Sequence, residues 1–228
     1  MNIKRCFLGV FIFLLRFTMS SVNNIMTEIE KIQQAERIST YDRMHLKMIS
    51  LMHDGIYSLY VDPHNLLKAA GLRSGQNVLE VGCGPGYFTV AAAEIVGDNG
   101  FLHSIDINPA AVQRVRQKVE EKGLKNVEVT RANVSKTALA QESIDLAFLF
   151  GIVHSLKDID SVLSEMYRII KPGGELVVQK SSWSESNLLK SFTKGSLFQF
   201  VEKDSRIYKF KKVDLEKRKD VCFSERNV

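Results

Sequence analysis

The chain has 228 residues, of which 45% are hydrophobic and 25% charged, which is enough for one α/β core with appendages. Its three cysteines, Cys6, Cys83 and Cys222, have neither CxxC nor Cys/His spacing, so they indicate neither a disulfide framework nor a metal site. The net charge of +5 lies at the two ends, because residues 1–22 and 209–228 each carry +3 and leave −1 for the remainder. We therefore expect no nucleic-acid partner.

Residues 1–22 form an apolar N-terminal segment. Ten mainly apolar residues, 6–15, follow Lys4 and Arg5, which is too few for the roughly 20 that span a bilayer. The pattern resembles a signal peptide or an interfacial anchor, or it reflects an upstream start codon with translation beginning at Met19 or Met26. We expect a cytoplasmic protein, with weak membrane association through this segment as an alternative.

Residues 23–62 have the pattern of a helical cap, with Ile25, Ile29 and Ile32 on one side of an amphipathic helix. Asp62 and Pro63 then predict the N-cap and first position of a short helix ending near residue 70.

From Gln76 onward, strand patterns alternate with helix patterns. Strands are predicted at 77–81, 101–105, 127–130, 144–150 and 175–179. Three helices are predicted between the strands. The first carries apolar residues at 88–95, the second begins at Pro109, and the third extends from Ile159 to Ile170 and ends before residues 171–174. This alternation favours right-handed crossovers and a mainly parallel sheet, whereas 197–201 and 207–211 predict a half-solvated hairpin at its edge.

A glycine loop, Gly82-Cys83-Gly84-Pro85-Gly86, directly follows the first strand, where an open α/β sheet binds its ligand. Glycines allow the backbone to approach a nucleoside and to adopt positive φ. The dinucleotide fingerprint GxGxxG would require glycine at Tyr87, but this chain has GxGxG. The preceding Glu80 would repel a pyrophosphate and attract, directly or through water, the ammonium group of a methionine moiety.

Two polar residues follow the next strands. Asp106 can accept hydrogen bonds from both hydroxyls of a ribose, and its alternative role is to cap the helix that begins at Pro109. Asn133 can contact an adenine amino group, and its alternative role is that of a turn asparagine.

The segments 78–89, 104–106, 144–146 and 168–175 resemble the successive motifs of class I S-adenosylmethionine-dependent methyltransferases, of the methyltransferase-11 or ubiquinone/menaquinone-biosynthesis type. The resemblance covers residues 63–213 and leaves 214–228 as a basic tail. It implies a Rossmann-like, seven-stranded, mostly parallel sheet with an antiparallel last strand and helices on both faces. It also implies S-adenosylmethionine as co-substrate, with Asp106 at the ribose and Asn133 at the adenine. The cofactor-binding positions are expected at Glu80, Gly82, Cys83, Gly84, Gly86, Asp106, Ile107 and Asn133.

Methyl transfer from a sulfonium requires mainly positioning, so no catalytic residue is obligatory. A hydroxyl or amine acceptor would benefit from a base, and His154 after the fourth strand is the candidate, with a structural role as the alternative. Tyr57 or Tyr60 is expected either to fold over the cofactor or to pack in the core. The acceptor is expected to be a small or lipid-like molecule. The competing function is a non-catalytic module with the same fold.

Overall fold

A computed structural model of the chain describes residues 26, 39–51, 61–180 and 182–214. The chain divides into two units, residues 1–39 and 40–228, and every element below belongs to the second unit. Residues 1–22, most of the predicted cap, and the tail from residue 215 lie outside the described residues.

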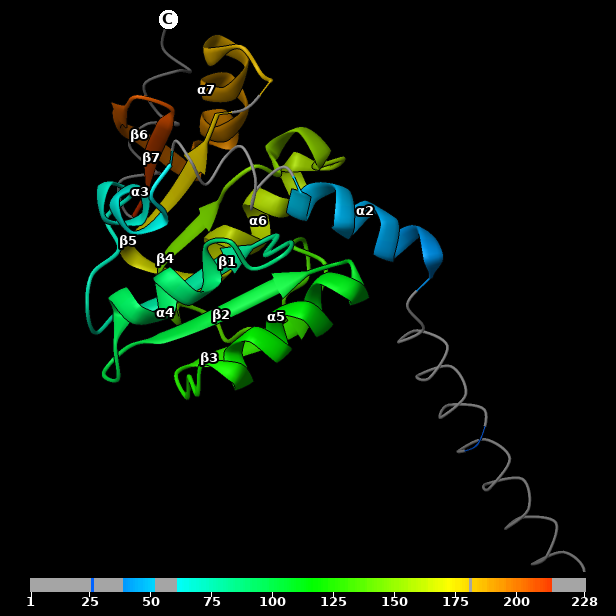
Figure 1. Cartoon of the computed structure of the whole chain (residues 1–228). Coiled ribbons are helices and arrows are strands. Elements are labelled where there is room, and N and C mark those ends of the chain that lie inside the picture. Colours follow the sequence, from blue (N-terminus) through cyan, green and yellow to red (C-terminus); the bar gives the residue numbers. More distant parts are fainter. Residues whose placement is uncertain (1–25, 27–38, 52–60, 181, 215–228) are drawn as a thin grey trace, which may run out of the picture. The chain divides into compact units, whose positions relative to one another are not determined.

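The described residues form a seven-stranded sheet in the order β3-β2-β1-β4-β5-β7-β6 (Figure 1). Strands β1 to β5 pair in parallel, whereas β7 is antiparallel to both β5 and β6. This confirms the predicted mostly parallel sheet and its antiparallel end. The chain order reverses between β1 and β4, which is where an open sheet of this kind binds its ligand. The strands are β1 (Asn77–Val81), β2 (Phe101–Asp106), β3 (Val127–Arg131), β4 (Ile144–Leu149), β5 (Ile170–Gln179), β6 (Phe198–Asp204) and β7 (Ile207–Lys212).

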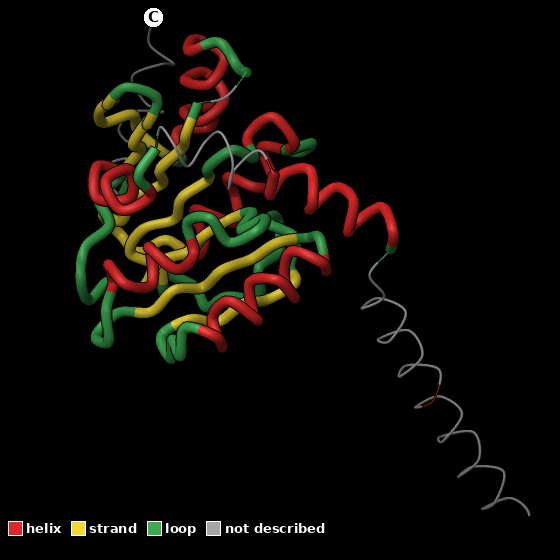
Figure 2. The backbone as a smooth tube through the Cα atoms, in the orientation of Figure 1, coloured by secondary structure: helices red, strands yellow, loops and turns green. Residues whose placement is uncertain are grey.

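The helices between these strands can be followed in Figure 2. Asp62 caps α3 as predicted, because its carboxylate accepts a hydrogen bond from the His64 N–H at 2.9 Å. Helix α7 was not predicted from the sequence. Its N-cap is Ser184, whose side chain accepts from the Asn187 N–H. The α-helices are α2 (Thr40–Leu51), α3 (Pro63–Ala69), α4 (Thr89–Val96), α5 (Pro109–Glu121), α6 (Ile159–Ile169) and α7 (Glu185–Thr193), and the short 3-10 helices are η3 (Val153–Ser155) and η4 (Lys194–Ser196).

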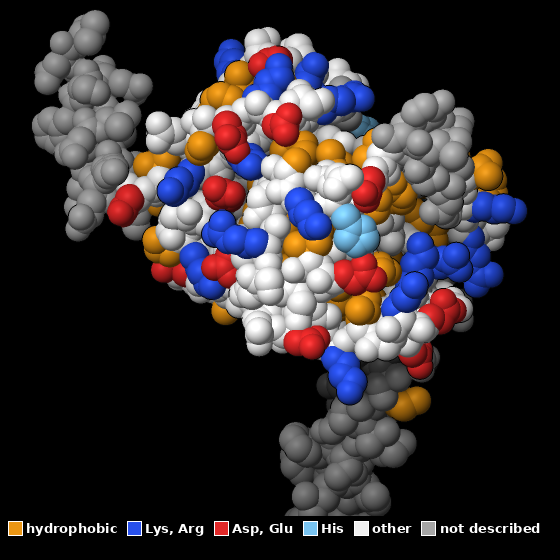
Figure 3. Space-filling model, turned by 60° about the vertical axis from the view of Figure 1, so that its left-hand side comes forward, with side chains coloured by type: hydrophobic (Ala, Val, Ile, Leu, Met, Phe, Trp, Pro, Cys, Tyr) orange, Lys and Arg blue, Asp and Glu red, His pale blue; other side chains and the backbone are white. Residues whose placement is uncertain are grey.

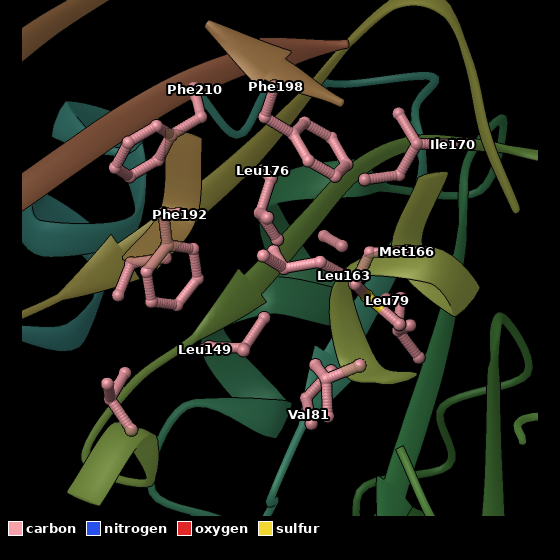
Figure 4. Packing of buried hydrophobic residues seen from close by; sticks show 14 of the residues in the cluster. Leu79, Val81, Leu149, Leu163, Met166, Ile170, Leu176, Phe192, Phe198 and Phe210 are labelled. Carbon is pink, nitrogen blue, oxygen red and sulfur yellow. The ribbon is translucent and has the colours of Figure 1, made fainter. Parts of the chain in front are cut away.

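Helices cover both faces of the sheet. Successive residues of a strand point to opposite faces, so each strand packs against helices on both sides. Val78 packs in the cluster that includes α3 and α4, whereas Leu79 packs in the cluster that includes α6 and α7. Figure 4 shows the second cluster, in which Leu163 and Met166 of α6 lie near Leu79. The two apolar layers hold the carboxyl ends of β1, β2 and β4 in fixed positions.

The junction between α6 and β5 differs from the prediction. Helix α6 ends at Ile169, and Ile170 already belongs to β5, where it pairs with Ile144 of β4. The next pair is Leu146 with Glu175, so residues 171–174 bulge out of the ladder instead of forming a separate turn. Gly174 is required there, because a Cβ atom would come within 2.8 Å of the Asp145 carbonyl oxygen.

The predicted localisation requires correction. No helix among residues 39–51, 61–180 and 182–214 is long and apolar enough to cross a membrane. Residues 1–22, on which the predicted membrane association depended, lie outside the described residues. We therefore withdraw the prediction of a cytoplasmic, membrane-associated protein. Figure 3 shows that lysine and arginine are interspersed with aspartate and glutamate on one face of the described part.

Candidate functional site

The glycine loop leaves β1 and is fastened to β2 before α4 begins. The backbone N–H groups of Gly82 and Cys83 both donate to the Ile105 carbonyl, at 2.8 and 3.1 Å. The Gly86 N–H donates to the Cys83 carbonyl at 2.8 Å. Gly82, Gly84 and Gly86 all have positive φ, at 77°, 50° and 78°. The loop therefore adopts a backbone shape that favours glycine, as the sequence predicted.

The glycines at 82 and 84 serve different purposes. A Cβ atom at Gly82 would overlap the Cγ2 atom of Ile152, so this glycine allows the loop after β4 to pack against the loop after β1. A Cβ atom at Gly84 would meet nothing within 4 Å. Gly84 therefore leaves open space beside a backbone segment, which is where a ligand can approach the loop.

Asp106 ends β2 directly beside the loop. Its Oδ2 atom accepts from the Gly84 N–H at 2.9 Å, and Oδ1 accepts from the Asn108 N–H at 2.8 Å. Burial raises the pKa of Asp106, although these backbone donors oppose the rise. The helix-cap alternative is wrong, because Asn108 caps α5 by accepting from the N–H groups of Ala110 and Ala111.

Glu80 lies buried behind the loop. Its Oε2 atom accepts hydrogen bonds from Thr89 Oγ1 and Ser104 Oγ, both at 2.7 Å. Burial raises the pKa of Glu80 to about 7, because these hydroxyls only partly replace water. Oε2 thus joins β1, β2 and the start of α4, so it fixes the loop from behind. A ligand contact would therefore involve the other carboxylate oxygen or an intervening water.

The Cys83 side chain packs away from the loop opening. It is a free, buried cysteine in a cluster with Val112, Val115 and Val129. Burial raises the pKa of its thiol well above the ordinary value, which favours the neutral form of the thiol. At this position only the backbone can contribute to a binding site.

The residues expected at the adenosine lie beyond β2 and β3. Ile107 is 65% exposed, which is unusual for an isoleucine at the end of a buried strand. Asn133 is exposed, and its Oδ1 atom accepts from both the N–H and the hydroxyl of Ser135, at 3.1 and 3.0 Å. This geometry favours the turn role for that oxygen. Contact with adenine stays a prediction for both residues.

The remaining candidates stay untested. His154 lies in η3, after β4, and its side chain is exposed. It is two residues beyond Ile152, which packs on Gly82. Its position is compatible with a role at the loop opening, and a catalytic role stays a prediction. Tyr57 and Tyr60 lie outside the described residues.

Several residues of the site were not singled out from the sequence. Ser104 and Thr89 hold Glu80, Ile152 packs on the loop, and Asn108 caps α5 beside Asp106. Ser104 pairs with Glu80 in the register of β2 and β1. The signal for it is a hydroxyl residue inside a strand, two positions before Asp106. For Asn108, the signal is asparagine directly before a proline.

A family described as "Methyltransferase domain" matches residues 72–223 of the chain. The chain belongs to this methyltransferase family. Together with the fold, the match identifies it as a class I S-adenosylmethionine-dependent methyltransferase. The glycine loop, Asp106 and Asn133 all lie inside the matched range.

Curated methyltransferases are similar to part of this chain. A demethylmenaquinone methyltransferase of Listeria welshimeri is 33% identical over 153 residues, which is 66% of this chain and 62% of that protein. A ubiquinone/menaquinone biosynthesis C-methyltransferase of Marinomonas sp. is 33% identical over 144 residues, which is 62% of this chain and 56% of that protein. The chain thus spans less than two thirds of the length of these relatives.

A solved structure of an S-adenosylmethionine-dependent methyltransferase from Aquifex aeolicus has the same fold. The TM-score is 0.65 at 24% identity, over 75% of this chain and 98% of that one.

Proposed function

We propose that this protein transfers a methyl group from S-adenosylmethionine to a small-molecule acceptor of the quinol type. The observation that carries the proposal is the Asp106 carboxylate, which is held against the Gly84 N–H beside open space. A carboxylate at this position can accept hydrogen bonds from the two hydroxyls of a ribose. S-adenosylmethionine supplies an activated methyl group on a sulfonium, which an acceptor takes by in-line displacement.

The residues around Asp106 fit an adenosine better than a dinucleotide. Glu80 places a carboxylate directly behind the glycine loop, which disfavours a pyrophosphate there, whereas Asp106 suits the ribose of either kind of cofactor. Exposed Ile107 offers an apolar surface next to the ribose position, and stacking of an adenine there would remove that surface from water. The expected cofactor set is therefore Glu80, Gly82, Cys83 through its backbone, Gly84, Gly86, Asp106, Ile107 and Asn133.

The quinol acceptor is proposed from the relatives, whose names give demethylmenaquinone and ubiquinone/menaquinone biosynthesis. Methylation of a ring carbon would form a carbon–carbon bond and break the sulfur–methyl bond. The electron pair of the broken bond stays on sulfur, and the acceptor then loses a proton. Exposed His154 is the proposed acceptor of that proton, because it follows β4 at the same sheet edge as the loop.

The test uses the full chain with labelled S-adenosylmethionine and a panel of acceptors that includes 1,4-dihydroxynaphthalene. We expect formation of S-adenosylhomocysteine and of a methylated ring, and reduced turnover without loss of cofactor affinity in His154→Gln. Binding of the cofactor with no turnover on any acceptor would favour the non-catalytic module. Binding of NAD in place of S-adenosylhomocysteine would exclude the proposed function.

A further inference from the structure

A hollow lined by α3, the last turn of α4 and residues 72–74 lies at the amino end of β1, and we call it the amino-edge hollow. Its volume of about 470 Å³ falls within the range of small-molecule sites, roughly 300–1,000 Å³. Residues 73 and 74 precede β1, whereas the glycine loop at 82–86 follows it, so about 16 Å of strand separates the two places. The hollow is therefore separate from the proposed cofactor site.

The walls and the lining of the amino-edge hollow come from two helices that pack together. Leu67 of α3 and Ala92 of α4 belong to one buried cluster. His64 Nε2 also donates to Glu94 Oε2 at 2.8 Å, which joins the two helices near the surface. Buried Leu72 and half-buried Ile95 line the hollow. Part of the lining is therefore apolar and can hold the apolar body of a ligand.

Two cationic side chains line the hollow without a partner. Lys68 and Arg73 are both exposed, and neither side chain forms an ion pair or a hydrogen bond with any residue that the structure describes. The acidic residue of the lining, Glu94, already accepts from His64. Two positive charges therefore face the hollow with no counter-charge of their own.

The backbone at the two helix ends does not cancel this positive charge. The last turns of α3 and α4 place partial negative charge near the hollow. The last carbonyls have donors, however, because the Ala70 N–H donates to the Leu66 carbonyl and the Gly75 N–H to the Val96 carbonyl, both at 2.9 Å. The unpaired cations are therefore the groups in the hollow that remain available to a ligand.

We propose that the amino-edge hollow binds a phosphate monoester of an apolar alcohol. The phosphate carries about two negative charges at pH 8, which match Lys68 and Arg73. The guanidinium can donate two parallel hydrogen bonds to it, and the Ser74 hydroxyl, which also lines the hollow, can donate another. The apolar part lies against Leu72 and Ile95, where its removal from water adds affinity.

The experiment is an NMR titration of the isotopically labelled full chain at about pH 8 with benzyl phosphate, benzyl alcohol and inorganic phosphate. The variant is Lys68→Gln combined with Arg73→Gln. The matched control is Lys122→Gln combined with Arg114→Gln, which removes the same two charges from exposed positions on and beside α5. We expect the Kd of benzyl phosphate to rise roughly 10-fold or more in the first variant and less than about twofold in the control.

A second variant, Glu94→Gln, should act in the opposite direction. It removes the negative charge that repels a phosphate in the hollow, so the Kd of benzyl phosphate should fall roughly threefold. A protein that had merely lost structure would not bind more tightly. An unchanged or higher Kd in Glu94→Gln would contradict the proposed site.

Four further outcomes would overturn the inference. Equal affinity for benzyl phosphate and benzyl alcohol would show that the cations do not recognise the ligand. Equal affinity for benzyl phosphate and inorganic phosphate would show that the apolar lining contributes nothing. An equal loss of affinity in the control variant would reduce the effect to overall charge. Displacement of benzyl phosphate by S-adenosylhomocysteine would place the probe at the glycine loop instead.

Discussion

Two regions of the molecule contain carboxylates that are largely shielded from solvent. The regions differ in the groups that donate hydrogen bonds to these carboxylates and in the direction of the pKa shift. At the carboxyl edge of β1 and β2, Glu80 and Asp106 accept hydrogen bonds only from neutral donors, and burial raises the pKa of both. On α6, Glu165 accepts from Arg168 at 2.8 Å and from the N–H and hydroxyl of Thr137, and its pKa falls to about 2.

This difference distinguishes the candidate binding site from the ion pair of Glu165 with Arg168, which has a structural role and which we call the structural strap. Glu165 and Arg168 fasten the loop between β3 and β4, because Arg168 also donates to the Leu139 carbonyl at 2.8 Å. Every charge in that strap has its partner. A buried carboxylate without a cation instead lowers stability, and carboxylates with such raised pKa values are concentrated at functional sites. Each of the following predictions tests one side of this comparison.

The largest expected effect is on cofactor affinity in Asp106→Ala. Loss of two hydrogen bonds from ribose hydroxyls to a charged group should cost about 4 kcal/mol, or roughly 1000-fold in Kd. Calorimetric titration with S-adenosylhomocysteine measures it. Asp98→Ala, on an exposed turn, is the control and should bind normally. A tenfold change or less in Asp106→Ala would mean that this carboxylate does not hold the ligand.

Glu80→Gln should change how stability depends on pH. Because the pKa of Glu80 is about 7 in the folded chain and 4.5 ordinarily, the folded state binds this proton more tightly than the unfolded state. Protonation of Glu80 therefore contributes to the free energy of unfolding. This contribution is fully present below pH 4.5 and is lost as the pH rises through about 7.

Between about pH 4 and pH 8, the unmodified protein should therefore lose about 3 kcal/mol relative to Glu80→Gln. Urea unfolding at several pH values measures the difference. A constant difference between the two proteins would show that burial does not perturb this carboxyl group.

Gly82→Ala and Gly84→Ala should separate packing from binding at the same loop. The new methyl group at 82 overlaps Ile152, so we expect a loss of about 2 kcal/mol in unfolding free energy, partly restored by Ile152→Ala. At 84 the methyl group enters open space, so the stability loss comes from the positive φ alone and should be smaller than at 82, whereas cofactor affinity should fall because the methyl group occupies the space beside the loop. Equal stability losses without any affinity change at 84 would remove Gly84 from the proposed site.

The smallest effect is expected for Glu165→Gln. Arg168 is 39% exposed, so solvent screening limits the loss to about 1 kcal/mol of unfolding free energy. The stabilisation by Glu165 is present above pH 4.5 and is lost as the pH falls through about 2. Cofactor affinity should not change. An affinity loss comparable to that in Asp106→Ala would erase the distinction between strap and site.

The sequence predicted the parts of the fold that depend on local pattern. The apolar runs at β1, β2 and β4, the cap at Asp62 and the hairpin after residue 197 all follow from periodicity and turn residues, and all are confirmed. The start of β5 at Ile170 could not be predicted in this way, because its pairing with Ile144 is a long-range contact across the sheet. Helix α7 was missed because its capping serine, Ser184, comes soon after the end of β5 at Gln179 and directly after Trp183.

The candidate site likewise contains residues that a local motif predicts and contacts that depend on tertiary packing. The glycine positions and Asp106 are legible as a motif at a strand end, whereas the hydroxyls of Thr89 and Ser104 meet Glu80 only after α4 and β2 have packed. The choice of Asn108 over Asp106 as helix cap depends on a backbone turn two residues long. The attachment of α2 beside Asp106 joins residues 66 positions apart and carries no local signal.

The most direct test of the account is a parallel calorimetric titration of the full chain with S-adenosylhomocysteine and with NAD, repeated on Asp106→Ala. We predict that S-adenosylhomocysteine binds the unmodified chain at one site, that NAD does not bind, and that the substitution abolishes measurable binding. Binding of NAD alone, or binding of S-adenosylhomocysteine that is unaffected by the loss of Asp106, would contradict the account.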